Sequence, residues 1–244
     1  MKTDGRLRTT TMVYPGLIGV VEAYTAVKYE YDFNNDGIYL DCTLITTADK
    51  FAAIGNDETK WPGNYVLGEN IDLEGRTDIT PIGGSKTAFT GKFSGNGHTI
   101  SNVEIKKSTE NYIGLFGRNG GLIADLHVEN ANVVGYSYVG GICGDNNDTI
   151  SGCTVSGNVR GDSYVGGISG RNSGTISRCD FSGEVKANLD VGGICGLTSG
   201  ESSQIDCCYS AGKITGNSSS AFGGIAGQNN NSETAITNCY YDNN

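Results

Sequence analysis

The chain repeats one pattern of apolar and polar positions. The stretch SYVGGICGDNNDTISGC (residues 137–153) returns with few changes as SYVGGISGRNSGTISRC (residues 163–179). The Val-Gly-Gly step recurs every 26 residues at Val139, Val165 and Val191, and a related step at residues 222–224 follows after 31 residues. A degenerate copy, YIGLFGRN, occupies residues 112–119. We therefore predict regular repeats over residues 96–244.

The apolar residues within each copy do not follow a helical period. The segment TISGCTVSGNVRG (residues 149–161) has short runs of β-branched and small residues interrupted by glycines, which is typical of short strands joined by tight corners. One copy cannot bury its own apolar side, but copies stacked about 4.8 Å apart form a continuous core. The pattern predicts an all-β fold, a parallel β-solenoid (β-helix) of about five to seven coils with roughly 26 residues per coil.

Stacking places equivalent cysteines in a ladder. Each lies three residues after the Ile that opens its copy, and the ladder is Cys153, Cys179, Cys208 and Cys239. An earlier copy has Leu126 at this position, which predicts an apolar interior site and free thiols that act as small hydrophobic side chains. In-register parallel side chains point the same way, which suits the dihedral angle of a disulfide poorly.

A second ladder consists of asparagines that follow the Gly-Gly-Ile segment. We expect their amides to hydrogen-bond along the solenoid axis and to support a bend in the chain. The fourth copy has Thr198 instead. The ladder comprises Asn119, Asn146, Asn172 and Asn229.

These repeats resemble the GLUG-motif family, whose units read roughly as Val-Gly-Gly-Leu-x-Gly-x-Asn, a short gap, then Ile-x-x-Cys. Upstream, NYVLGENIDLEG, PIGG and AFTGKFSGNGHTISNVEI (within residues 64–105) are similar to the segment that precedes such repeats in bacterial cell-surface proteins. These proteins include adhesin-like proteins and the non-catalytic parts of IgA-specific metallopeptidases. The resemblance covers roughly residues 45–244. It implies an extracellular solenoid at the bacterial cell surface and no common enzymatic activity.

Residues 1–44 have no counterpart in that family pattern. VKYEYDF and IYLDCTL around NNDG predict two alternating strands and a turn. TTADKFAAIG (residues 46–55) predicts a two-turn helix with a Thr cap and a Gly stop. We expect residues 1–44 to be a cap or assembly arm and residues 45–244 to be the solenoid, because an exposed first coil would invite another chain to pair.

Charge and hydropathy exclude two classes of partner. The net charge of −10 and the pI near 4.6 exclude a nucleic-acid-binding protein, which needs clustered Lys and Arg. The apolar stretch over residues 12–27 is broken by Pro15, Gly16, Gly19 and Glu22, so no membrane span is predicted.

The start of the chain lacks the pattern of a secretory leader. We expect a leader to have been removed, or another route of export.

A calcium loop is the one cofactor site that the sequence suggests. Asp32, Asn34, Asp36 and Gly37 have the spacing with which such a loop opens. The closing acid is missing at the twelfth position, and Asp41 stands two places early. An ordinary hairpin turn is the favoured interpretation, with Ca²⁺ as the alternative and no other cofactor.

A ligand-binding strip is predicted from tyrosines. Tyr112, Tyr138 and Tyr164 precede the repeated aliphatic residue on successive coils, and Tyr136 lies beside them. Because successive side chains of a strand point to opposite faces, these tyrosines are expected to face away from the core. On the outside they would form an aromatic surface for sugar rings or for a protein. The alternative is mutual stacking that stiffens the sheet.

We predict a non-catalytic protein. Neither His98 nor His127 is paired with a recognisable nucleophile motif, and the acids are scattered rather than held as a pair. The leading function is a rigid stalk or adhesion surface of a bacterial surface protein, whose partner is a host or microbial surface glycan or protein. The second is a fibre subunit or virion component joined end to end with identical subunits. A polysaccharide-active enzyme is the least favoured.

Overall fold

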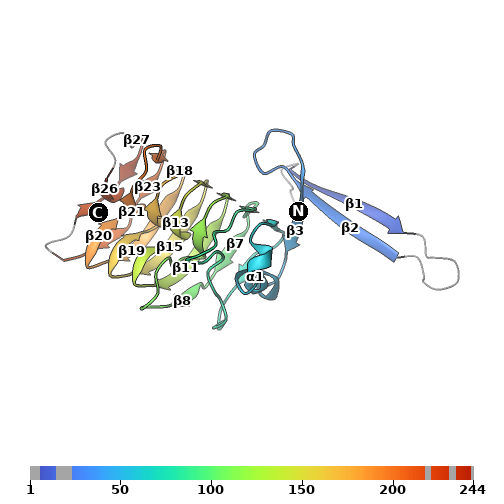
Figure 1. Ribbon diagram of the computed structural model, residues 1–244, viewed down its shortest axis with the longest axis horizontal. Helices are drawn as coiled ribbons and strands as arrows, with labels where there is room; N and C mark the ends of the chain where they lie inside the picture. The colour runs from blue at the N-terminus through green and yellow to red at the C-terminus, as the bar shows by residue number, and fades with distance from the viewer. Residues whose placement is uncertain (1–5, 15–23, 218–220, 231–234, 243–244) are drawn as a thin grey trace.

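The chain folds as a parallel β-solenoid (Figure 1). A computed structural model describes residues 6–14, 24–217, 221–230 and 235–242. It is 52% strand and 5% helix, with about 6 turns about 27 residues apart. The predicted fold class and repeat length are confirmed. No helix among the described residues combines the length and apolar character needed to cross a membrane.

Each regular coil has four strands, and each strand pairs in parallel with its equivalent in the next coil. We name the four resulting sheets after a feature of their strands. The first is the Ile sheet, which contains β4 (Asn64–Leu67), β6 (Lys92–Ser94), β10 (Leu122–Ala124), β14 (Thr149–Ser151), β18 (Thr175–Ser177), β22 (Gln204–Asp206) and β27 (Ala235–Thr237).

The second is the long-strand sheet, which contains β5 (Ile71–Asp72), β7 (Thr99–Ser101), β8 (Glu104–Lys106), β11 (His127–Val134), β15 (Thr154–Arg160), β19 (Asp180–Lys186), β23 (Tyr209–Ser210), β24 (Lys213–Thr215) and β28 (Tyr240–Tyr241). The Val sheet contains β12 (Ser137–Gly140), β16 (Ser163–Gly166), β20 (Leu189–Gly192) and β25 (Phe222–Gly223). The Asn sheet contains β9 (Phe116–Asn119), β13 (Cys143–Asn146), β17 (Ser169–Asn172), β21 (Cys195–Thr198) and β26 (Ala226–Asn229).

The core is a stack of aliphatic rungs. Ile123, Ile150, Ile176 and Ile205 are Cα partners on consecutive strands of the Ile sheet, and all four are fully buried. Burying one such side chain stabilises the fold by about 1.5–3 kcal/mol. Because every coil repeats the same rungs, the core continues along the axis.

Both predicted ladders lie on consecutive coils. Asn119 and Asn146 each donate a side-chain hydrogen bond of 2.8 Å to the next Asn of the ladder, and Thr198 continues the register. The cysteines Cys153, Cys179 and Cys208 are buried, and each donates its thiol to a backbone carbonyl. All eight cysteines are free.

A glycine of each repeat is required where the Asn sheet meets the Val sheet. A Cβ at Gly170 would lie 2.3 Å from the backbone carbon of Tyr138, in the preceding coil. Gly144 stands in the same relation to Tyr112, at 2.4 Å. The repeated glycine thus lets two backbones approach more closely than any side chain allows.

The N-terminal segment extends the Ile sheet. Strands β1 (Leu7–Tyr14) and β2 (Tyr24–Tyr31) form an antiparallel hairpin that projects from the solenoid (Figure 1). Strand β3 (Leu40–Ile45) pairs with β2 antiparallel, as predicted, and with β4 in parallel. Strand β1 was not predicted, and β3 crosses the predicted boundary at residue 44.

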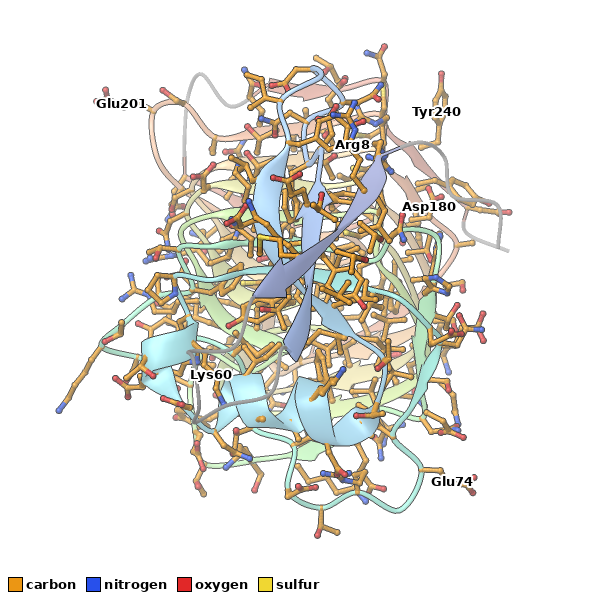
Figure 2. The ribbon with its side chains drawn as sticks, turned by 90° about the vertical axis from the view of Figure 1, so that its right-hand side faces the viewer. Arg8, Lys60, Glu74, Asp180, Glu201 and Tyr240 are labelled. Atoms are coloured by element: carbon orange, nitrogen blue, oxygen red, sulfur yellow. The ribbon has the colours of Figure 1, made fainter. Side chains whose placement is uncertain are left out.

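The predicted cap helix is α1 (Ala48–Gly55), followed by a 3₁₀ turn, η1 (Glu58–Lys60). Thr47 caps α1 by accepting a hydrogen bond from the Lys50 N–H at 3.3 Å. Gly55 is the last helical residue rather than the stop, and Asn56 is the C-cap. Figure 2 looks onto this end of the rod, where the helix lies in front of the coils. Phe51 is buried against Phe93, with ring centroids 6.2 Å apart, so α1 covers the first coils.

Candidate functional site

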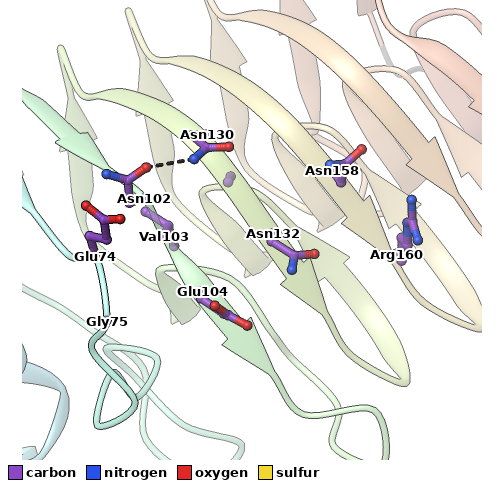
Figure 3. Close-up of a pocket in the computed structure, with 10 residues that line it drawn as sticks. Glu74, Gly75, Asn102, Val103, Glu104, Asn130, Asn132, Asn158 and Arg160 are labelled. Atoms are coloured by element: carbon purple, nitrogen blue, oxygen red, sulfur yellow. Dashed lines mark hydrogen bonds between the residues drawn. The ribbon is translucent and has the colours of Figure 1, made fainter.

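The long-strand sheet carries a groove on its outer face. Its strands bend midway, at Asn102 and Asn130 with φ of 56° and 52°, and at Gly157 and Gly183 with φ of 129° and 138°. The register between β11 and β15 shifts at this bend. The groove has a volume of about 490 Å³ and follows the solenoid axis across successive coils (Figure 3). Its polar lining consists of Glu74, Asn102, Glu104, Asn130, Asn132, Asn158 and Arg160.

One wall of the groove is an ordered row of amides. Asn130 donates from Nδ2 to Asn102 Oδ1 at 2.7 Å, as Figure 3 shows. Asn102 donates in turn to Asp72 Oδ1 at 2.8 Å. That hydrogen bond, with a second from the Glu74 backbone N–H, holds the pKa of Asp72 below its usual range. The row is therefore fixed before any ligand binds.

The other wall holds amides that the protein does not use. Asn132 and Asn158 are Cα partners on adjacent strands, both half-buried. Within the described part of the chain, their side chains have no hydrogen-bond partner. Each amide offers two N–H donors and two oxygen lone pairs. The nearby charges are largely paired, because Glu104 contacts Lys106 and Arg160 contacts Glu184 at 2.9 Å.

A second hollow of about 300 Å³ opens on the same sheet. Thr154, Asp180 and Tyr209 line it as Cα partners on consecutive strands. Tyr209 is 40% exposed, so an aromatic ring faces solvent here. His127 Nδ1 lies 2.8 Å from Thr154 Oγ1. Tyr240, the Cα partner of Tyr209, is 71% exposed, so the outer face of this sheet offers amides, hydroxyls, carboxylates and tyrosine rings along the axis.

The tyrosine strip predicted from the sequence forms a stack. The rings of Tyr112, Tyr138 and Tyr164 lie 5.1 and 5.0 Å apart with interplanar angles of 6° and 9°. All three residues have positive φ, which L side chains rarely adopt. Burial is the main cause that raises the pKa of Tyr138, and the neighbouring tyrosines raise it further. Tyr136 is 48% exposed and lines a separate hollow.

Two arginines and a buried carboxylate pack against this stack. Arg118 and Arg171 lie over the Tyr112 and Tyr138 rings, 5.6 Å from each centroid. Both arginines pair with Asp145, which is fully buried, at 3.1 and 2.7 Å from their Nε atoms. The ring faces are thus in contact with each other and with arginine, which favours the mutual-stacking interpretation. Ligand binding at this strip stays a prediction.

The predicted calcium loop closes on its own backbone. The Asp32 carboxylate accepts hydrogen bonds from the N–H groups of Asp36 at 3.1 Å and Gly37 at 2.7 Å. Burial raises the pKa of Asp32, but these bonds outweigh it and hold the pKa below its usual range. Asn34 donates to Asp36 at 3.4 Å, and Asp41 pairs with Lys28 at 2.7 Å. Over the described residues, no group of three or more His, Cys, Asp or Glu is arranged to hold a metal.

Neither the buried thiols nor the histidines line the groove. Burial raises the pKa of Cys195 to about 12 and moves that of Cys143 upward as well. A reactive cysteine needs a lowered pKa, so these two thiols fit the packing role that the sequence predicted. His98 Nδ1 lies 3.3 Å from Asn70 Oδ1, in the turn after β6.

Comparisons with known proteins find similarity both in sequence and in structure. The chain is 36% identical to halomucin from Haloquadratum walsbyi over 116 residues, which is 43% of this chain and 1% of halomucin. It superposes with a TM-score of 0.66 on a crystal structure described as a candidate immunoglobulin A1 protease from Bacteroides ovatus. That match has 24% identity and covers 82% of this chain and 75% of the other, and it concerns the fold alone. No family model matches the chain, so the GLUG resemblance stays a prediction.

Proposed function

We propose that this chain is a non-catalytic module of an extracellular surface protein, a rigid rod that presents the axial groove to a ligand. The observation that carries the proposal is the groove itself, whose polar side chains repeat on successive coils of one sheet. A repeated outward surface suits the recognition of an extended partner. Parallel pairing of each regular coil with its neighbours makes the rod stiff.

The similarity to halomucin supports an extracellular setting, since a mucin by name is a secreted or surface protein. The structural neighbour contributes the fold only, and its activity does not transfer to this chain. Four of the seven polar side chains that line the groove are amides, which is consistent with binding rather than catalysis.

Labelling of intact cells tests the location. Lys106 and Lys213 have side chains that are 60% and 76% exposed, so a membrane-impermeant amine reagent will reach them on a displayed protein. We expect intact producing cells to label this chain as strongly as a lysate does. Labelling that appears only after lysis contradicts the extracellular assignment, and a cytoplasmic protein serves as the control.

Self-assembly into a fibre is the second candidate. It is supported by apolar side chains on the last described strands, where Phe222 is 48%, Ile236 37% and Tyr240 71% exposed. Such surfaces and open strand edges attract another chain. Sedimentation velocity over a wide concentration range tests this candidate, and a strictly monomeric chain contradicts it.

A further inference from the structure

We propose that the groove of the long-strand sheet binds an uncharged linear glycan laid parallel to the solenoid axis. This inference rests on the proposed function and names the ligand class of that site.

The direction of the groove selects a polymer. Asn132 and Asn158 occupy the same position on adjacent coils, which are about 4.8 Å apart along the axis. A sugar ring in an extended glycan has a similar length, so successive rings can meet successive amides. A peptide that binds by strand addition needs an open sheet edge. Strands β11 and β15 have neighbours on both sides, so their backbones offer no such edge.

The chemistry of the walls selects hydroxyl groups. A sugar hydroxyl both donates and accepts hydrogen bonds, and so does an amide. The side chains of Asn132 and Asn158 keep this full capacity within the described residues. Asn102 and Asn130 are already held in place by each other and by Asp72, so they lose little conformational entropy when a ligand binds.

The charge of the groove disfavours acidic polymers. Glu74 and Glu104 lie at one end of the groove, and Arg160, at the other, is paired with Glu184. The chain carries a net charge of −10, which repels uronic acid chains, sulfated glycans and nucleic acids at long range. Because the central lining side chains are neutral amides, a neutral glycan matches the site best.

The extent of the polar face sets the length of the ligand. The groove crosses the coils that contain Glu74, Asn102, Asn130 and Asn158, and the hollow with Tyr209 lies beside it, on the other side of the strand bend. The exposed face of that tyrosine ring suits the apolar face of a sugar. Affinity is therefore expected to rise with length up to about a tetrasaccharide, with one ring for each coil that the groove crosses.

Calorimetric titration of the full chain tests the proposal. The probes are size series of linear glucose, mannose, galactose and N-acetylglucosamine oligosaccharides, with polygalacturonate as the acidic comparison. We expect at least one neutral series to bind with affinity that increases with length. Each amide contributes a neutral hydrogen bond, so Asn132→Ala with Asn158→Ala is expected to weaken that binding roughly tenfold.

Asn147→Ala is the matched control, because Asn147 is an exposed asparagine between β13 and β14, on a different side of the coil. It is expected to bind like the parent chain, and circular dichroism confirms that all variants fold. Failure of every neutral series to bind, tighter binding of polygalacturonate, or full binding by the double variant overturns the inference. Since surface labelling does not depend on the groove, these outcomes leave the extracellular assignment standing.

Discussion

At the scale of single residues, buried polar groups define which coil contacts which. Asn146 donates to the Asp148 carbonyl at 3.1 Å and to Asn172 at 2.8 Å, and accepts from Asn119. A shift of one position in the stacking would leave these groups unpaired in the interior. The Asn ladder therefore fixes the register as well as adding stability.

Replacing Asn146 with Ala is expected to destabilise the fold by about 2–4 kcal/mol, because it removes the ladder bonds and leaves the groups on Asn119 and Asn172 unsatisfied. Urea denaturation measures the change. The neighbouring Asn147→Ala, on an exposed side chain, is expected to change stability by less than about 0.5 kcal/mol. Equal losses of stability for the two variants would show that the ladder hydrogen bonds do not contribute to the free energy of unfolding.

The carboxylates with lowered pKa make stability depend on acid. Asp32 and Asp72 have folded pKa values below the unfolded value of 3.8, so the unfolded state binds more protons in this range. Their contribution is complete above about pH 4 and is lost as the pH falls through the folded pKa values. We expect the urea concentration at the unfolding midpoint to decrease when the pH is lowered below 4. Asp32→Asn is expected to make the urea midpoint less dependent on pH in this range. If the variant shows the same pH dependence as the parent chain, Asp32 does not contribute to the acid sensitivity.

The same loop allows a test of calcium. The Asp32 oxygens already accept two backbone N–H groups, and Asp41 pairs with Lys28, so these carboxylates have partners within the protein. We expect the melting temperature to be the same in excess calcium and in excess chelator. A calcium-dependent rise that Asp36→Asn abolishes would establish the alternative and identify the loop as the site.

At the scale of elements, the glycines decide how strands fit together. Gly170 lies where β17 passes the Tyr138 backbone, and no side chain can shift to make room there. Gly120 follows β9, and a Cβ there would have its nearest neighbour at 3.6 Å. The two glycines occupy different positions of the repeat, and they differ in the space around them.

Gly170→Ala is expected to cost about 3 kcal/mol or more, because the added carbon clashes with backbone rather than with a movable side chain. Gly120→Ala, with room for the methyl group, is expected to be nearly neutral. Thermal denaturation of both variants measures the difference. Similar melting temperatures would mean that β17 can move away from the Val sheet at low cost.

The sequence predicted the elements that repeat and, among those that do not, only the ones with clear local signals. Ile150 and Cys153 recur at fixed spacing, and this spacing alone is enough to place them in the interior. Strand β1 is a single copy with no periodic partner, so it was not recognised. The helix α1 was found because the Thr cap at its start and Gly55 at its end are local signals.

The candidate site was harder to predict than the fold. The groove depends on the bends at Asn130 and Gly157, and a bulge changes which residues face outward without changing the composition. The recurrence of Asn132 and Asn158 after one coil was the available signal. The tyrosines were predicted correctly as a ladder, but Arg171 packs on them only because the Val and Asn sheets meet closely.

At the scale of the whole molecule, the rod consists of nearly interchangeable coils. Ser163 and Leu189, which open equivalent strands of the Val sheet, are Cα partners. Removing residues 163–188 therefore joins two coils in the correct register. Each coil contacts mainly its neighbours, so the loss is local.

This deletion is expected to yield a folded, somewhat less stable chain that is shorter by about one 4.8 Å rung. The removed coil contains Arg171, so Asp145 would lose one of its two arginines and some stability with it. Circular dichroism and small-angle X-ray scattering measure the fold and the length. An unfolded product would show that the coils are more interdependent than their pairing suggests.

The bend shared by the long strands has a consequence for how such a protein changes over generations. Duplicating a coil would lengthen the recess by one rung and add another pair of hydrogen-bonding contacts, while the existing coils keep their shape. Affinity for a polymeric partner would then change with the number of coils, and no individual coil would need a new sequence.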